Sequence, residues 1–275
     1  MSTLIRQTAV SAPRPNAFMW GGAAVLSIVA LAGLGLQYGF EGWSRAFLHG
    51  LCAQRESHSF HFGSDVLPVD ARMTGIYLGA ASTLGWLGAS GRLRRIKRPD
   101  MATIVLLALF VMVMALDGFN ALLIDLGFSG PYAPSNTLRF ITGTLAGTTL
   151  GVGVAYLFAT SIWRNPERAR RLIDGPATLI APMLTTGAFG IVAASGLQIF
   201  YGPLVIALVL AATTVFWMFS VTLLALLSGR GWAYTRASDL GPIGICGLMT
   251  GLALIAAFAG FRFLAEHLWT LPQLP

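Results

Sequence analysis

The sequence predicts an all-α integral membrane protein, a polytopic helical bundle with seven transmembrane helices. Hydrophobic residues make up 55% of the chain and charged residues only 11%, and the mean hydropathy is +0.71. This composition is typical of a chain surrounded mostly by lipid. In addition, seven apolar runs reach the length of about 20 residues that a helix needs to cross roughly 30 Å of hydrocarbon.

Each apolar run is predicted to be a helix, because lipid offers no partner for open backbone N–H and C=O groups. The alternating ten-residue pattern of a membrane barrel is absent from the sequence. We place the helices at residues 17–38, 73–91, 101–124, 137–163, 176–200, 202–228 and 241–265. Residues 1–16 then form an N-terminal tail, residues 17–165 a four-helix region, and residues 166–275 an additional three-helix region.

Basic residues are concentrated in the N-terminal tail and in the loops after the second, fourth and sixth helices. They are Arg6, Arg14, Arg92, Arg94, Arg95, Lys97, Arg98, Arg164, Arg168, Arg170, Arg171, Arg230 and Arg236. By the positive-inside rule, the N-terminus and these loops are cytoplasmic, and the C-terminus is outside. The net charge of +7 therefore reflects topology, and no nucleic-acid partner is expected.

The longest segment between predicted helices, residues 39–72, lies on the outer face in this orientation. Its candidate metal ligands, all of residue types that bind metal ions, are Cys52, His58, His61 and Asp70. Their spacing matches no metal-binding motif, so the alternative is that the histidines are solvated loop residues. Cys52 and Cys246 are expected a membrane apart, which predicts two free thiols and no intramolecular disulfide.

Polar side chains within or beside the apolar runs gather at the predicted outer ends of three helices. They are Arg72, Tyr77, Asp117, Asn120, Asn136 and Arg139. An ionisable side chain deep in a membrane helix costs roughly 2.5 to 3.5 kcal/mol on insertion scales, so Asp117 needs a partner, and Arg72 and Arg139 are the nearest candidates. We predict that the six residues form one ligand-binding site. The alternative is a structural ion pair between Asp117 and Arg139.

Glycine spacing predicts which helices approach closely. The fourth helix has Gly143, Gly147 and Gly151 at four-residue intervals, and the second has Gly75 and Gly79. Such small-residue ridges allow helix backbones to come together in lipid. We therefore expect the second, third and fourth helices to form one tight unit. The uncharged helices at 176–200 and 202–228 are expected to form a lipid-facing hairpin.

Several of these residues also carry a resemblance to a known family. The block Cys52-Ala53-Gln54 and the segment from Pro68 to Tyr77 resemble an uncharacterised family of prokaryotic polytopic membrane proteins. Its members carry a Cys-His-Gln block and then Pro-x-Cys-x-Arg-Cys-x-Gly-x-Tyr entering a helix. Its later motifs, Asp-Gly-x-Asn and Arg-x-x-Thr-Gly, correspond here to residues 117–120 and 139–143.

The resemblance covers roughly residues 45–160 and implies a multi-pass protein of the prokaryotic cytoplasmic (inner) membrane. It implies no activity, because the family is a domain of unknown function. The chain is a divergent member of the pattern: Ala53 stands where the family has histidine, and Asp70 and Met73 stand where it has cysteines.

Three classes of function remain open, because no catalytic or cofactor motif is complete. A binding or accessory protein would hold an anionic lipid headgroup, another anionic small molecule, a quinone or a partner subunit. The one-sided placement of the polar residues favours this class. An enzyme acting on a lipid-like substrate would use Asp117 as acid or base. A small-solute transporter would need polar groups near the midplane and broken helices, for which Pro182 is the only signal.

Overall fold

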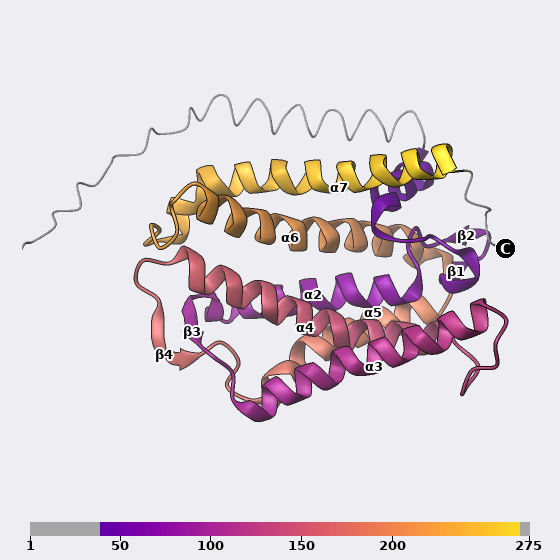
Figure 1. The fold of residues 1–275 in the computed structure, drawn as a ribbon, viewed down its shortest axis with the longest axis horizontal. Helices are drawn as coiled ribbons and strands as arrows, with labels where there is room; N and C mark the ends of the chain where they lie inside the picture. The colour runs from indigo at the N-terminus through magenta and orange to yellow at the C-terminus, as the bar shows by residue number, and fades with distance from the viewer. Residues whose placement is uncertain (1–38, 270–275) are drawn as a thin grey trace, which may run out of the picture.

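The computed structural model describes residues 39–269 of the 275-residue chain. In this range the chain is mainly helical, and its long helices lie side by side along the longest axis of the molecule (Figure 1). They are α2 (Ala71–Ala89), α3 (Met101–Asp125), α4 (Asn136–Ile162), α5 (Ile180–Ala194), α6 (Tyr201–Leu227) and α7 (Gly241–Trp269). The helix expected at 17–38 and the tail 1–16 lie outside the described residues.

Within residues 39–269, five helical segments are long and apolar enough to cross a membrane. They are Met101–Asp125, Asn136–Ile162, Pro176–Ala194, Gln198–Leu227 and Ala237–Leu268. The predicted class, an all-α membrane protein, is confirmed at this level. The remaining long helix, α2, is enclosed by α4, α5 and α6, which explains why its sequence can be less apolar than that of a lipid-exposed helix.

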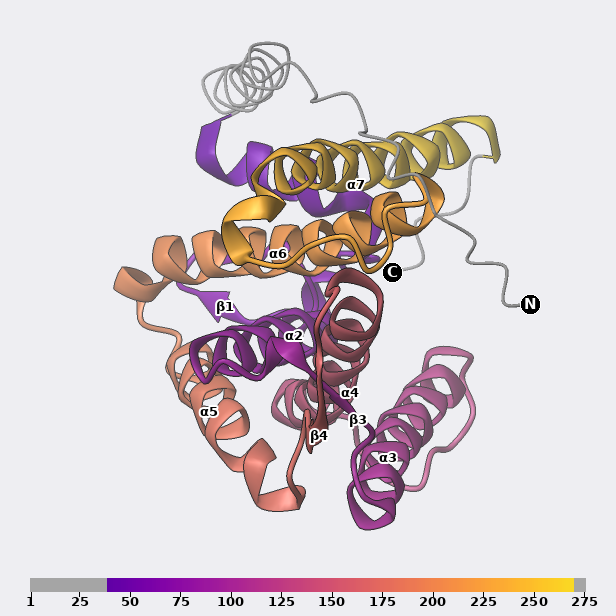
Figure 2. The same cartoon turned by 90° about the vertical axis from the view of Figure 1, so that its left-hand side faces the viewer.

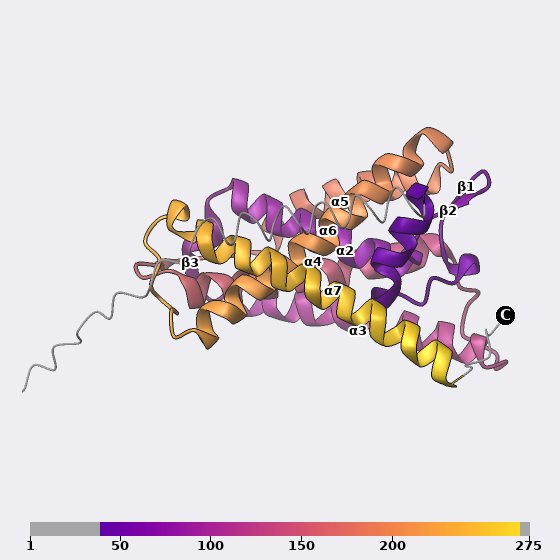
Figure 3. The same ribbon diagram turned by 90° about the horizontal axis from the view of Figure 1, so that it is seen from above.

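Short elements collect at the two ends of the bundle (Figures 1 and 3). At one end, called here the loop end, helical residues 39–48 are followed by η1 (His49–Leu51), η2 (Glu56–His58) and the hairpin of β1 (His61–Phe62) with β2 (Asp65–Val66). The α3–α4 connection, η5 (Gln198–Phe200) and the C-terminal end of α7 lie there too.

The opposite end, called here the basic end, holds η3 (Arg92–Arg94), η4 (Pro176–Leu179) and η6 (Ala237–Leu240). There β3 (Arg95–Lys97) pairs in parallel with β4 (Glu167–Arg171), and Trp163 forms an isolated bridge with Tyr234. The three basic loops, which are far apart in sequence, are therefore brought together at one end of the bundle.

The predicted close approach of the second and fourth helices is confirmed. A Cβ added to Gly147 would lie 2.7 Å from the Ile76 Cα, and one added to Gly79 would lie 2.9 Å from the Thr144 carbonyl oxygen. Glycine is therefore required for the backbones of α2 and α4 to touch. The third helix is not part of this tight unit: α3 packs mainly on α4 and leaves a broad apolar face exposed.

The expectation of a lipid-facing hairpin at 176–228 is wrong. Figure 2 shows α5 splayed away from α6, and α6 lying between α7 and the α2–α4 pair. Leu204, Val205, Leu208 and Ala212 of α6 are buried in the core. The sequence is apolar on every side of both helices, so its pattern could not distinguish a protein-facing surface from a lipid-facing one.

Candidate functional site

The centre of the candidate site is the buried carboxylate of Asp117 in α3, which accepts three hydrogen bonds. Arg72 Nη2 donates to Oδ2 at 2.5 Å, Thr142 Oγ1 donates to Oδ2 at 3.1 Å, and the Tyr132 hydroxyl donates to Oδ1 at 2.9 Å. Asp117 is only 2% exposed. The predicted need for a cationic partner is therefore met by Arg72, and the two added hydroxyl donors favour the ionised form of the carboxylate.

The position of Arg72 follows from how α2 begins and how it packs. Asp70 is the N-cap of α2, and its Oδ1 accepts a hydrogen bond from the Met73 N–H at 2.7 Å. Two residues later, Arg72 passes α4 at Gly143, where an added Cβ would lie 3.0 Å from the Arg72 carbonyl carbon. The glycine ridge therefore brings the start of α2 beside Thr142, and through it beside Asp117.

Arg139 of α4 is buried without a carboxylate partner among the described residues. It is 5% exposed, its Nη1 donates to Asn136 Oδ1 at 3.0 Å, and its Nε has no hydrogen-bond partner within residues 39–269. No Asp or Glu oxygen of the described chain lies within ion-pair distance of it. The alternative expectation of a direct Asp117–Arg139 pair is therefore wrong, because Arg72 occupies that role.

The loop over this site is attached to it by two contacts. Asn136 Nδ2 donates to the Ser59 carbonyl at 2.9 Å, and Arg55 Nη1 forms an ion pair with Asp125 at 2.6 Å. His58 lies between these contacts, with its Nε2 3.8 Å from Asp125 Oδ1. Burial, followed by the positive charge of Arg139, lowers the pKa of His58, so the ring adds no charge at neutral pH.

The two remaining predicted site residues, Asn120 and Tyr77, differ in whether they lie at the site. Asn120 lies one turn beyond Asp117 and is buried, and its Nδ2 donates to the Tyr132 carbonyl at 3.1 Å, so it supports the loop that carries Tyr132. Tyr77 does not belong to the cluster. Its ring is buried in the apolar core together with Cys52 and Phe62, because five residues of helix rotate it about 140° away from Arg72.

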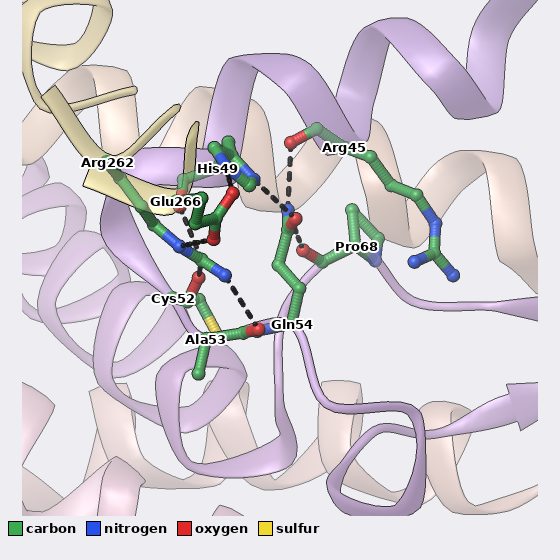
Figure 4. A network of polar contacts seen from close by, with 8 residues as sticks. All are labelled: Arg45, His49, Cys52, Ala53, Gln54, Pro68, Arg262 and Glu266. Carbon is green, nitrogen blue, oxygen red and sulfur yellow. Dashed lines mark hydrogen bonds and ion pairs between the residues drawn. The ribbon is translucent and has the colours of Figure 1, made fainter. Parts of the chain in front are cut away.

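A second polar network lies at the loop end and attaches α7 to residues 49–54 (Figure 4). Arg262 donates to the carbonyls of His49, Cys52 and Ala53, and Glu266 binds both Arg262 Nε at 2.7 Å and His49 Nε2 at 3.0 Å. Gln54, whose φ is +56°, donates from Nε2 to the carbonyls of Arg45 and Pro68 at 2.8 Å. These contacts fix residues 49–54 against α7 and against the segment that leads into α2.

Cys52 and Asp70, two of the four candidate metal ligands, lie in contact. The Cys52 thiol donates to Asp70 Oδ2 at 3.3 Å and accepts the N–H groups of Gln54 and Asp70. Burial, followed by the Asp70 charge, raises the pKa of Cys52 to about 12, so the sulfur stays a thiol at neutral pH.

The four candidates do not converge on one metal site. His61 Nδ1 contacts the Ser59 carbonyl, and His58 lies by Asp125. Within residues 39–269, no three Asp, Glu, His or Cys side chains form a group that could hold a metal ion. Both cysteines are free, and Cys246 lies sixteen residues of α7, about 24 Å at 1.5 Å per residue, from the Arg262 that contacts the Cys52 carbonyl.

Sequence reasoning missed Tyr132, Thr142, Arg55 and Asp125 as members of the site. Thr142 could have been found, because it lies three residues after Arg139 on the same helical face. Tyr132 lies in the α3–α4 loop, whose path no sequence pattern defines. Partial burial and the hydrogen bond to Asp117 raise the pKa of its hydroxyl, so it remains a donor over the whole neutral range.

The comparisons with known proteins give one match. Residues 52–153 match the model of a family described as a predicted membrane protein (DUF2085). The matched segment contains α2, α3 and most of α4, and therefore every residue of the Asp117 cluster. No curated protein and no solved structure matches the chain.

Proposed function

We propose that this protein is a binding or accessory protein of the prokaryotic cytoplasmic membrane, with seven transmembrane helices and a site at the loop end that holds an anionic ligand. The N-terminus and the basic end face the cytoplasm, and the loop end and the C-terminus face outward. The ligand is the anionic headgroup of an outer-leaflet lipid, in preference to a quinone or a partner subunit. The match of residues 52–153 to a predicted membrane protein family supports the membrane location.

The observation that carries this proposal is the charge of Arg139. Arg72 forms an ion pair with Asp117 and Arg55 with Asp125, but no described carboxylate lies within ion-pair distance of Arg139. An uncompensated buried charge carries an effective penalty of several kcal/mol. Binding an anion removes that penalty, so an anionic ligand would stabilise the protein as well as occupy the site.

The two other classes receive less support from the geometry. An enzyme using Asp117 as its acid or base would need a carboxylate free to exchange a proton, whereas Arg72, Tyr132 and Thr142 all stabilise the ionised form. A transporter would need free polar groups near the midplane. The buried threonines there, such as Thr148, donate to carbonyls of their own helix instead.

The orientation is tested by cysteine accessibility in a variant lacking Cys52 and Cys246. With His58→Cys, we expect a membrane-impermeant maleimide to label intact cells from outside. With Arg95→Cys, at the basic end, we expect labelling only after the inner face has been opened. Labelling of position 95 in intact cells, without labelling of position 58, would reverse the topology and remove the outer-leaflet assignment of the site.

The ligand-binding proposal is tested by replacing Arg139 with glutamine. We expect the purified wild-type protein to retain an anionic lipid in native mass spectra, and Arg139→Gln to lose most of that occupancy. Arg168→Gln is the matched control, because it removes an exposed arginine of the basic end that forms no described ion pair. Equal anion occupancy in all three proteins would leave Arg139 a purely structural residue.

A further inference from the structure

We infer that the ligand head is a singly charged phosphodiester, gripped by the Nε–Nη2 edge of Arg139. This inference rests on the proposed function, and it names the chemical class of the bound anion. Its support comes from which guanidinium atoms are free, from the charge balance of the cluster, and from the apolar surface beside the site.

The free atoms of Arg139 form one edge of its guanidinium group. Asn136 Oδ1 accepts a hydrogen bond from Nη1. Nε has no partner among the described residues, and no described hydrogen bond involves Nη2. Nε–H and one N–H of Nη2 point in the same direction, which is the fork that binds two oxygen atoms of a carboxylate or phosphate. A ligand with a single acceptor atom would leave half of this fork unsatisfied.

The neighbouring fork of Arg72 is not equally free. Its Nη2 is committed to Asp117 at 2.5 Å, although its Nε also has no described partner. Arg72 therefore serves mainly to hold Asp117, and its remaining N–H can contact an outer oxygen of a ligand already held by Arg139. The two arginines thus differ in role: Arg72 is paired inside the protein, whereas the Nε–Nη2 edge of the buried Arg139 has no partner among the described residues.

The charge balance of the cluster favours a monoanion. Arg72 with Asp117 and Arg55 with Asp125 are neutral pairs, and the depressed pKa of His58 leaves that ring uncharged at neutral pH. Arg139 is then the one arginine of this group without an ion-pair partner among the described residues. Asp70 offsets part of its charge at longer range, and the positive end of the α4 helix dipole adds to it. One phosphodiester charge neutralises Arg139, whereas a dianion would overcompensate it.

The surroundings of the site favour an amphipathic ligand. Leu116 and Phe119 of α3 are 62% and 60% exposed and flank the buried Asp117 and Asn120, and Ile141 beside Thr142 is 49% exposed. These apolar side chains face outward at the depth of the polar cluster. A lipid can therefore place its chains against them while its phosphodiester reaches Arg139, which a soluble phosphate ester cannot do.

The inference is tested on delipidated full-length protein by native mass spectrometry with four separate probes: phosphatidylglycerol, phosphatidylcholine, palmitate and inorganic phosphate. We expect phosphatidylglycerol to bind the wild type at least about tenfold more tightly than the other three. Phosphatidylcholine is expected to bind weakly, because its own cation cancels the phosphodiester charge. Arg139→Lys keeps the charge but loses the fork, and is expected to weaken phosphatidylglycerol binding by about tenfold.

Each other outcome overturns a defined part of the inference. Palmitate binding as tightly as phosphatidylglycerol, and lost in Arg139→Lys, would make the ligand a carboxylate while leaving the proposed function intact. Tight binding of inorganic phosphate alone would show that the bound anion is free phosphate and not a lipid headgroup. If the wild type binds none of the anions above the level of phosphatidylcholine, the proposed function itself fails. These comparisons on the wild type do not depend on whether an Arg139 variant folds.

Discussion

Replacing Gly147 with leucine is expected to lower the free energy of unfolding by about 3 kcal/mol or more, because the new side chain has no space between α4 and α2. A Cβ at this position would lie 2.7 Å from the Ile76 Cα and 2.8 Å from the Ile76 carbonyl carbon. These are backbone atoms, so no rotamer change can relieve the overlap. The helices would have to separate along the ridge that positions Arg72. The loss is measurable as a lower midpoint of unfolding in mixed detergent micelles.

Gly153→Leu is the matched control for this experiment. Gly153 lies on the same helix, and an ideal Cβ there meets no atom within 4 Å. The substitution gives the same change in helix propensity and hydrophobicity without the overlap, and it is expected to leave stability unchanged or slightly raised. Equal midpoints for the two variants would contradict the close backbone contact of α2 and α4.

The helices themselves were predictable from the sequence, because their length is set by the thickness of the membrane. The run at 137–163 appears as Asn136–Ile162, and the run at 101–124 as Met101–Asp125. The prediction of a single helix at 176–200 was less accurate. It is divided into η4, α5 and η5, and Pro182, which lacks an N–H, falls in the first turn of α5, where no intrahelical donor is needed.

The arrangement of the helices was only partly predictable. Glycine ridges identified the α2–α4 contact, because only small residues permit touching backbones. The central place of α6 left no such signal. Leucine and valine pack equally well against lipid and against protein, so the buried face of α6, with Leu204 and Leu208, looks the same in sequence as its exposed face, with Leu210.

The candidate site was predicted in its charges but not in its hydrogen bonds. Asp117 and Arg72 were identified as partners because an intramembrane carboxylate needs a cation. Helical spacing also contained the evidence against Tyr77, which lies on a different face of α2 from Arg72. Tyr132 could not have been identified, because the α3–α4 loop must fold back over α3 before its hydroxyl reaches Asp117, and that path depends on tertiary contacts such as the one with Asn120.

Replacing Asp117 with asparagine is expected to destabilise the protein by about 3 to 5 kcal/mol, the usual cost of removing one partner of a buried ion pair. The variant keeps the shape of the side chain but leaves Arg72, like Arg139, without a carboxylate partner. It also gives the Tyr132 and Thr142 hydroxyls a weaker acceptor. Asp125→Asn is the matched control, because it breaks the more exposed Arg55–Asp125 pair and is expected to cost only about 1 kcal/mol or less.

The double variant Asp117→Asn with Arg72→Gln separates a specific pair from general damage to the site. Because Arg72 is the residue in direct contact with Asp117, removing its charge should restore a large part of the lost stability, and the cycle should show a coupling of about 1 to 3 kcal/mol. Arg139→Gln, combined with Asp117→Asn, should restore less, since Arg139 makes no direct bond to the carboxylate. Recovery through Arg139 but not through Arg72 would contradict the pairing seen at Asp117. That outcome would also mean that Asp117 already compensates Arg139, which would then have no unpaired charge for an anion.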